Sequence, residues 1–396
     1  MGDLPELLVN GFVSPRFAGV KTAFEENFTK RNELGGACCV YLNGEKVVDL
    51  WGGVRDPATG APWEDDTMVI VFSLTKGMSA FTLALAHSRG WLDYDACVAI
   101  YWPEFAQNGK EAITVRQLLA HQAGLHAFHE KVDRSIIADL DRLAAVLARE
   151  KPAWPAGTRN AYHFLSLGFY EGELMRRVDP SHRSLGQFFQ EEIAAPLGLD
   201  FYIRLPEGLP NERLAPLSQP GFVKSILGYP FPMIRALMNP WSDAFRACIV
   251  NPGSAVVMDK DRIYARKLEV PSGGGVGTAR AIAKAYGVFA TGGAEIGLRP
   301  ETLAALRAPA IPPSEGPFDE VLRGEAQYAL GFMKPSAGFT FGHPDAFGAP
   351  GAGGSLGYAD PAIGLGYGYV TNRIELGIDP DPRDVALRVA IASAIG

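Results

Sequence analysis

The sequence contains little cysteine and no pattern typical of a metal site. Its four cysteines, Cys38, Cys39, Cys97 and Cys248, form no C-x-x-C pair. The histidines form no cluster with the spacing of zinc ligands either. We therefore expect free, mostly buried thiols in a reducing cytoplasm, and we expect neither a metal nor another cofactor.

The sequence also lacks long hydrophobic runs and an excess of positive charge. No stretch approaches the run of about 18 apolar residues that a membrane helix needs. The first residues, Met-Gly-Asp-Leu-Pro-Glu, lack the basic and apolar regions of a signal peptide. The chain has 37 Lys and Arg against 44 Asp and Glu, a net charge of −7, which argues against a general nucleic-acid binder. We expect a cytoplasmic protein with no membrane partner and no nucleic-acid partner.

The composition itself is that of a folded protein. The chain has 396 residues, of which 47% are hydrophobic, a fraction too high for a disordered protein. At roughly 150 residues per domain, this length suggests two domains.

Both ends of the chain carry strand and helix signals. Apolar residues at three-to-four spacing predict a helix over 14–31, and an Asn43-Gly44 turn predicts a hairpin over 36–51. Near the other end, a final helix should begin after Asp381, with Pro382 in its first turn. Apolar runs there also predict three strands, at 338–342, 354–359 and 364–372.

The middle of the chain is mainly helical in pattern. One apolar stripe predicts a helix from Ser73 to Arg89, ended by Gly90, and 113–120 and 135–149 also look helical. Residues 204–271 are rich in proline and irregular, as in a wall or lid of a site or in a tolerated insertion.

These patterns together predict an α/β protein of the α+β type. An antiparallel sheet flanked by helices is formed from both chain termini, and a mostly helical domain is inserted between them. We place the sheet domain at 1–70 and 271–396 and the helical domain at 71–270, with 204–270 walling the active site.

The first candidate for chemistry is the S-x-x-K motif Ser73-Leu74-Thr75-Lys76. At the start of a helix, residues three apart share one face, so Lys76 can reach Ser73. A serine hydroxyl needs a neighbouring base to act as a nucleophile, and a lysine desolvated among apolar side chains can be neutral enough to serve. Taken alone, one such match is close to what chance provides.

Three further segments follow Ser73 along the chain: Leu118-Leu119-Ala120-His121-Gln122-Ala123-Gly124-Leu125, Pro155-Ala156-Gly157-Thr158-Arg159-Asn160-Ala161-Tyr162 and Gly348-Ala349-Pro350-Gly351-Ala352-Gly353-Gly354-Ser355. In this order and at these separations, the four segments resemble the serine β-lactamase and penicillin-binding-protein-like superfamily, and most of all its class C branch and the family VIII carboxylesterases. The resemblance covers roughly residues 15–395.

The resemblance implies a role for each matching residue. Ser73 is the acylated nucleophile, and Lys76 is its base partner. Tyr162, with a pKa depressed by Lys76, carries protons to the leaving group and from the deacylating water. The backbone N–H groups of Ser73 and Ala352 form the oxyanion hole. His121 looks structural, ending a helix and bonding to backbone.

The sequence departs from the β-lactamase pattern at two motifs. Where β-lactamases have Tyr-x-Asn, this chain has Phe164, which offers no amide to a substrate. The third motif, usually Lys-Thr-Gly or His-x-Gly, is Ala349-Pro350-Gly351, unless His343 occupies that place. We assign Phe164 and Gly351 to substrate binding, and both departures favour apolar, uncharged esters.

Two other motifs are weaker candidates. Gly353 to Gly357 matches the G-x-S-x-G nucleophile elbow around Ser355, but no helix is expected after it, so we interpret Ser355 as a turn residue. The glycine run from Gly273 to Gly277 resembles a dinucleotide motif only faintly. It is better interpreted as a flexible turn beside the site, with Thr278 restarting a helix.

The leading hypothesis is a serine carboxylesterase that acts on short-chain, apolar esters through an acyl-enzyme on Ser73. Its partner is then a small-molecule ester. A β-lactamase, or a D-amino-acid peptidase or acyltransferase of the same superfamily, is the alternative within the same chemistry. A catalytically idle binding protein derived from the superfamily is the alternative from another class.

Overall fold

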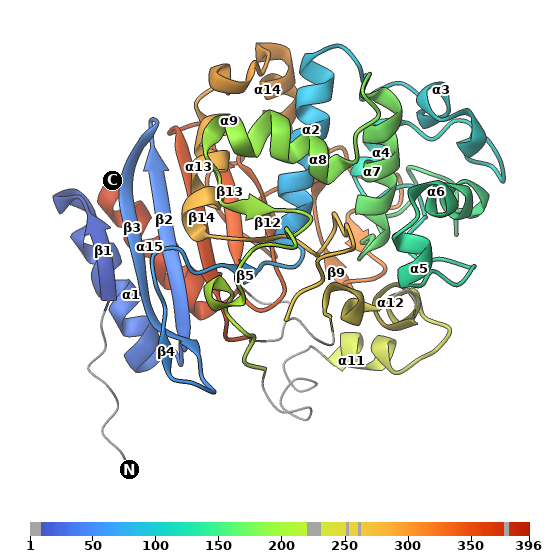
Figure 1. Ribbon diagram of the computed structural model, residues 1–396. Helices are drawn as coiled ribbons and strands as arrows, with labels where there is room; N and C mark the ends of the chain where they lie inside the picture. Colours follow the sequence, from blue (N-terminus) through green and yellow to red (C-terminus); the bar gives the residue numbers. More distant parts are fainter. Residues whose placement is uncertain (1–8, 220–230, 251–252, 260–262, 376–379) are drawn as a thin grey trace.

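The computed structural model describes residues 9–219, 231–250, 253–259, 263–375 and 380–396. It has two parts, a twisted sheet with helices on both faces and a mostly helical region beside it (Figure 1). The predicted fold class, an antiparallel sheet built from both chain ends with an inserted helical part, is confirmed.

In the described part of the chain the main sheet has nine strands, all paired antiparallel. The two chain ends meet where β2 pairs with β14, with Leu42 opposite Leu365. In order across the sheet the strands are β1 (Val9–Val13), β3 (Glu45–Asp56), β2 (Gly35–Leu42), β14 (Leu365–Thr371), β13 (Leu356–Asp360), β12 (Phe347–Pro350), β11 (Phe332–Met333) and β10 (Tyr328–Ala329), with β4 (Ala61–Pro62) paired to β3.

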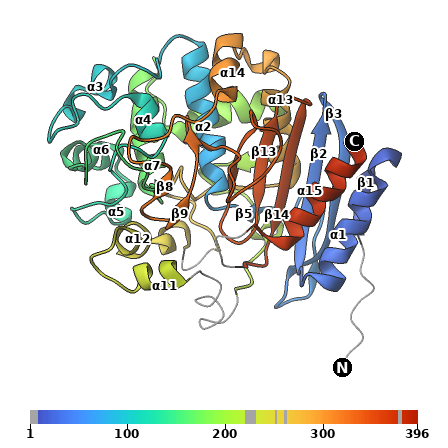
Figure 2. The ribbon, with the colours of Figure 1, turned by 180° about the vertical axis from the view of Figure 1, so that it is seen from behind.

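Helices cover both faces of this sheet. The helices α1 (Ala18–Lys30) and α15 (Pro382–Ile395) lie side by side on the outer face (Figure 2). On the other face α13 (Ala279–Ala290) packs on β14 and β2. The approach is close at Gly366, because a β-carbon there would lie 2.1 Å from the backbone nitrogen of Gly287.

The long helix α2 (Leu74–Ser88) runs between the sheet and the helical part and is buried over nearly its whole length. A small sheet of β5 (Val69–Ile70), β7 (Val276–Gly277) and β6 (Phe201–Tyr202) leads into it. The remaining elements are α3 (Val98–Tyr101), α4 (Val115–Leu119), α5 (Arg134–Ile137), α6 (Leu140–Arg149), α7 (Ser166–Val178), α8 (Leu185–Phe189), α9 (Ala195–Leu197), α11 (Phe231–Leu237), α12 (Asp243–Phe245), α14 (Pro300–Arg307), β8 (Phe318–Asp319) and β9 (Gly324–Glu325).

Several predicted elements are confirmed with their caps. Asn43 and Gly44 both have positive φ (51° and 82°), as a type I′ hairpin turn requires. Thr278 caps α13 by accepting the Ala281 N–H, and Asp381 caps α15 by accepting the Arg383 N–H. No helix in the described ranges has both the length and the apolarity needed to cross a membrane.

Two predicted elements differ from the structure. Residues 338–342 do not form a strand; Ser336 and Phe339 pair only as an isolated bridge within a turn. The single helix predicted over 135–149 is two helices, because Asp139 interrupts the first and caps the second through the Arg142 N–H. The predicted irregular segment 204–271 includes residues 220–230, 251–252 and 260–262, which lie outside the described residues.

A buried arginine ties the C-terminal helix to the turn between β12 and β13. The Arg383 side chain is fully buried and donates to Glu33 (3.0 Å), Asp381 (2.6 Å) and the Gly353 carbonyl (3.2 Å). Removing the cation would leave two carboxylates in the interior without their counter-charge. Arg383 therefore holds the chain ends together and fixes the loop that follows β12.

We predict that Arg383→Met lowers the free energy of unfolding by about 3–5 kcal/mol, because Glu33 and Asp381 lose their buried partner. Chemical denaturation measures this loss. Lys30→Met, which breaks an exposed pair with Glu26, is the control and should change stability by less than about 0.5 kcal/mol. Equal midpoints for wild type and Arg383→Met would contradict the assigned role.

Candidate active site

Ser73 stands at the junction between β5 and α2. It is the N-cap residue of α2, so its side chain lies at the positive end of a long buried helix. The chain before it is held to the glycine-rich segment, since the Val71 N–H donates to the Gly275 carbonyl at 2.9 Å. The predicted position of the glycine run beside the site is thus observed.

The turn that presents Ser73 is strained at Phe72. Phe72 has a φ of +45°, a left-handed conformation that bulky residues rarely adopt. Thr75 holds this turn: its hydroxyl donates to the Phe72 carbonyl at 2.5 Å and accepts the Gly275 N–H at 2.9 Å. Thr75, the third residue of the S-x-x-K motif, therefore holds the turn that presents Ser73.

Lys76 is buried, and its amine has three neighbours. Nζ donates to the carbonyl oxygens of Phe164 (2.7 Å) and Ser272 (3.0 Å) and lies 3.2 Å from the Ser73 hydroxyl. A neutral amine has two N–H donors and one lone pair, and carbonyls only accept. When Lys76 is neutral, its two N–H groups are therefore used by the carbonyls and its lone pair faces Ser73.

Burial lowers the pKa of Lys76 to about 7, and the nearby Glu171 and Cys248 partly oppose this shift. Both neighbours lie on other elements, Glu171 in α7 and Cys248 in the π-helical turn Arg246–Val250. A large fraction of Lys76 is therefore unprotonated near neutral pH, where an exposed lysine would be fully charged. An unprotonated amine next to Ser73 could accept the proton of its hydroxyl at neutral pH.

Tyr162 is the third group of the cluster. Its ring centroid lies 4.7 Å from Lys76 Nζ, and Ser73 is close enough to lower the pKa of its phenol. The centroid of the buried His121 ring lies 4.8 Å from that of the tyrosine ring. His121 Nδ1 in turn accepts the backbone N–H of the buried His163 at 2.9 Å. His121 thus bonds to backbone, as expected, and positions the tyrosine.

The expectation that Lys76 depresses the pKa of Tyr162 is wrong. Burial raises the pKa of the Tyr162 phenol, and the nearness of Ser73 offsets only part of this effect. Because desolvation penalises the phenolate, Tyr162 keeps its proton at neutral pH. It is therefore suited to give a proton to a leaving group, whereas Lys76 is suited to take the proton of Ser73.

The two proposed oxyanion donors, the N–H groups of Ser73 and Ala352, belong to two segments of the chain that lie close together. A β-carbon at Gly351 would lie 2.1 Å from the Val71 carbonyl oxygen, so the end of β12 lies directly against the turn before Ser73. Among the described residues, the N–H groups of Ser73 and Ala352 donate to no backbone oxygen. The Gly353 carbonyl, next to Ala352, accepts a hydrogen bond from Arg383 at 3.2 Å.

The structure decides which residue stands at the third motif. Ala349 packs against α2, since a β-carbon at Gly77 would be 3.1 Å from that of Ala349. His343 instead donates its backbone N–H to Asp360 at 2.9 Å, and its ring contacts the same carboxylate. Ala349 to Gly351 therefore occupies the place beside the serine, and the motif carries no cation.

Ser355 is a turn residue, as interpreted. Its carbonyl accepts the Gly351 N–H at 2.7 Å in the turn between β12 and β13, and a strand follows it. A nucleophile elbow would need a helix there. The arrangement therefore excludes the α/β-hydrolase interpretation of this motif.

The proline-rich segment reaches the site through its described part. Ala247 and Cys248 pack with Ala161, Tyr162 and Phe164 in one apolar cluster. The Phe164 side chain therefore contributes to the wall, while its carbonyl oxygen holds Lys76. Besides the substrate-binding role predicted from the sequence, Phe164 therefore has a structural role, because its backbone carbonyl binds the amine of Lys76.

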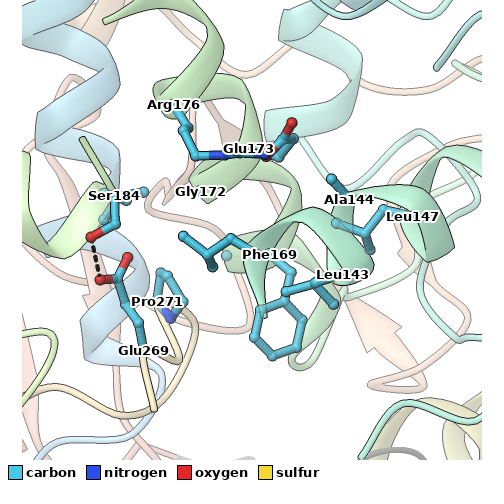
Figure 3. A pocket seen from close by; sticks show the side chains of 13 residues that line it. Leu143, Ala144, Leu147, Phe169, Gly172, Glu173, Arg176, Ser184, Glu269 and Pro271 are labelled. Carbon is cyan, nitrogen blue, oxygen red and sulfur yellow. Dashed lines mark hydrogen bonds and ion pairs between the residues drawn. The ribbon is translucent and has the colours of Figure 1, made fainter. Parts of the chain in front are cut away.

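A separate pocket lies behind α7 (Figure 3). It is lined mainly by apolar side chains of α6 and α7, and its wall includes Glu269, which accepts the Ser184 hydroxyl at 2.7 Å. None of Ser73, Lys76 and Tyr162 lines it. Glu269 also accepts the Gly186 N–H at 2.9 Å, so it caps the start of α8.

Some residues that contact or surround Lys76 and Ser73 could not be identified from the sequence pattern. The Ser272 carbonyl is a backbone group at the start of the glycine run, and Thr75 is an unremarked residue inside the motif. Glu171 is one position in a mixed helix, and Cys248 lies in the irregular segment. The sequence pointed to these parts of the chain only through the glycine run and the irregular segment 204–270.

Within the described ranges, no group of three or more His, Cys, Asp and Glu residues could hold a metal ion.

Known proteins resemble the whole chain. Residues 20–390 match the Beta-lactamase family. The chain is 34% identical to "Esterase/beta-lactamase LipL" of Mycobacterium tuberculosis, over 92% of this chain and 83% of that protein. Among solved structures, a family VIII carboxylesterase superposes with a TM-score of 0.85 at 36% identity, over 98% of this chain and 100% of that one. A penicillin-binding protein homologue from Caulobacter crescentus gives 0.82 at 35%, with 98% and 100% covered.

We predict that a fluorophosphonate probe labels Ser73 with a rate that rises with pH and has its midpoint at about 7, because Lys76 must be neutral to act as a base. Rates measured over about two pH units on each side give the curve. Lys76→Met should lower the plateau rate by a factor of about 10²–10⁴. A rate that does not change with pH would contradict the assignment.

We predict that Gly351→Ala lowers the labelling rate of Ser73 at least about tenfold, because the added carbon would clash with the Val71 carbonyl and displace the oxyanion loop. Gly172→Ala is the matched control, since its nearest neighbour would be 4.0 Å away. Equal rates in the two variants would show that the approach of Gly351 to Val71 is not required.

Proposed function

Because this chain belongs to the beta-lactamase family, we propose that it is a serine carboxylesterase that hydrolyses short-chain, apolar esters through an acyl-enzyme on Ser73. The observation that carries the proposal is the amine of Lys76, which is buried, held by two carbonyls and 3.2 Å from the Ser73 hydroxyl. A serine with such a base beside it is suited to acyl transfer.

In the proposed acylation, the Ser73 oxygen attacks the ester carbonyl while its proton passes to Lys76. The negative charge that develops on the carbonyl oxygen is stabilised by the N–H groups of Ser73 and Ala352. Because the start of α2 also points at this place, the helix dipole adds to the stabilisation. The tetrahedral intermediate then releases the alcohol.

Tyr162 supplies the proton for the departing alkoxide in this scheme. The nearness of its ring to Lys76 Nζ (4.7 Å) and of its phenol to Ser73 supports this role. The phenolate then regains its proton from the ammonium of Lys76, which restores the neutral amine. Deacylation reverses these transfers: a water gives a proton to the Lys76 and Tyr162 pair as it attacks the acyl carbon. The pair passes that proton to the Ser73 oxygen as its bond to the acyl carbon breaks, which releases the acid and restores the serine hydroxyl.

The proposed preference for apolar esters rests on what lines the site. Phe164 and Ala349 stand where β-lactamases offer an amide and a cation to their substrate. Neither side chain can bind a carboxylate, and the wall around Tyr162 is apolar. The named relatives and neighbours include an esterase and a carboxylesterase, which supports the reaction class.

The name of the relative LipL, an esterase/beta-lactamase, keeps β-lactam hydrolysis as a second candidate. The same serine, lysine and tyrosine could open a β-lactam ring, but an amide leaving group needs more anchoring than an alkoxide. We propose that esters are the better substrates. We also propose that the enzyme works in the cytoplasm without a cofactor. The four cysteines are free thiols, which is compatible with a reducing compartment.

We predict that the wild-type chain hydrolyses p-nitrophenyl esters of short acids and that nitrocefin is turned over slowly or not at all. Ser73→Ala should lower kcat at least about 10⁴-fold, and Tyr162→Phe about 10²-fold, because each removes a group that acts on the reacting atoms. Ser355→Ala is the control and should retain activity.

The panel distinguishes the candidates. Full ester turnover by Ser73→Ala would contradict the proposal, and loss in Ser355→Ala alone would move the nucleophile to the other serine. Nitrocefin turnover faster than ester turnover would establish the β-lactamase. A folded wild-type chain that neither turns over esters nor reacts with the fluorophosphonate would favour a binding protein.

A further inference from the structure

Glu171 is a buried acid whose carboxyl has no hydrogen-bond partner among the described residues. It lies in α7 with no exposed surface, and neither carboxyl oxygen is bonded to another group in the described part of the chain. The other deeply buried acids differ: Glu33 accepts the hydroxyl of Thr371 at 2.7 Å, and Asp319 accepts the backbone N–H of Val321 at 2.9 Å. A buried carboxyl without such donors is costly, so its presence requires an explanation.

The carboxyl of Glu171 faces the helix that carries Lys76. A β-carbon at Gly331 would lie 3.1 Å from Glu171 Oε1 and 2.6 Å from the β-carbon of Ala80. Ala80 follows Lys76 by four residues, so the two share one face of α2, and α7 packs against α2 along this region. Glu171 therefore lies beside α2 near Ala80, one helical turn along the chain from Lys76, and its side chain is out of contact with solvent.

The other groups that face Lys76 hold a constant charge near neutral pH. Burial raises the pKa of the Cys248 thiol to about 12 and also raises that of Tyr162, so both stay protonated. Burial lowers the pKa of His163 to about 3 and that of His121 well below its usual value, so both stay neutral. Glu171 differs, because burial raises its pKa to about 8.

We propose that Glu171 is a positioning residue for the reaction, a buried electrostatic partner that sets how readily Lys76 accepts the proton of Ser73. The inference rests on the proposed function only in that Lys76 is the base of Ser73. When the carboxyl is protonated, it has no net effect on the amine's charge. When it is ionised, it favours the ammonium form of Lys76, and Ser73 then has no base.

This coupling makes activation of Ser73 a two-group titration. Loss of the first proton yields two forms, one with neutral Lys76 beside a carboxylic acid and one with the ammonium beside a carboxylate. Only the first form activates Ser73. Glu171 therefore broadens the rise of activity with pH and moves it upward, so that full activity is reached only in mildly alkaline conditions.

The test is the pH dependence of Ser73 labelling by a fluorophosphonate, compared between wild type and Glu171→Gln. The glutamine keeps the shape and removes the charge, so the midpoint should move to lower pH by about 0.5–1 unit and the rise should become a single ionisation. Glu173→Gln is the control on the same helix, because its carboxylate pairs with Arg176 and Arg177 instead.

Glu171→Leu is the second variant, because a leucine there needs no hydrogen-bond partner and preserves folding if the amide does not. The same downward shift in either folded variant, with the control unmoved, supports the proposal. An unmoved midpoint in folded variants would overturn the role of Glu171 while leaving the proposed function intact. Absence of labelling in the wild-type chain would overturn both.

Discussion

A lysine amine removed from water and held by two backbone carbonyls is the interaction on which the site depends. The amine of Lys76 meets oxygens from two segments far apart in the chain, at Phe164 and Ser272, and lies beside Ser73 at the start of its own helix. These contacts require that α2 be buried between the sheet and the helical part. The fold that buries α2 is thus also what lowers the pKa of its lysine.

Burial also sets the protonation states of the groups around the lysine. Histidines are kept neutral, and the phenol and thiol are kept protonated, so the site carries little fixed charge. A site with so little fixed charge is compatible with the uncharged ester that we propose as the substrate. This arrangement costs free energy at two residues. The backbone of Phe72 is strained, and the carboxyl of Glu171 has no hydrogen-bond partner among the described residues. Such costs are common where a fold is adapted to chemistry, and buried networks such as that of Arg383 offset them elsewhere.

The sequence predicts what depends on local spacing. The hairpin at Asn43-Gly44 follows from residues that adopt positive φ, and the pairing of Ser73 with Lys76 follows from helical periodicity. The carbonyls that hold Lys76 could not be predicted, because a backbone oxygen leaves no mark on residue type. The pKa of Tyr162 was predicted in the wrong direction, because nearness to a lysine can be inferred from motifs whereas burial cannot. The apolar run at 338–342 predicted a strand, yet Phe341 is buried against Tyr358 without any strand there.

The central claim is that Lys76 is a neutral amine when it meets Ser73, and a direct titration of its side chain tests that claim. Lysine labelled with ¹³C at Cε reports protonation by NMR, and the Lys76 signal is assigned by its absence in Lys76→Met. The account predicts one lysine whose signal titrates at about 7, well below the usual lysine pKa of about 10.4. A Lys76 signal that remains that of an ammonium above about pH 9 would contradict the account.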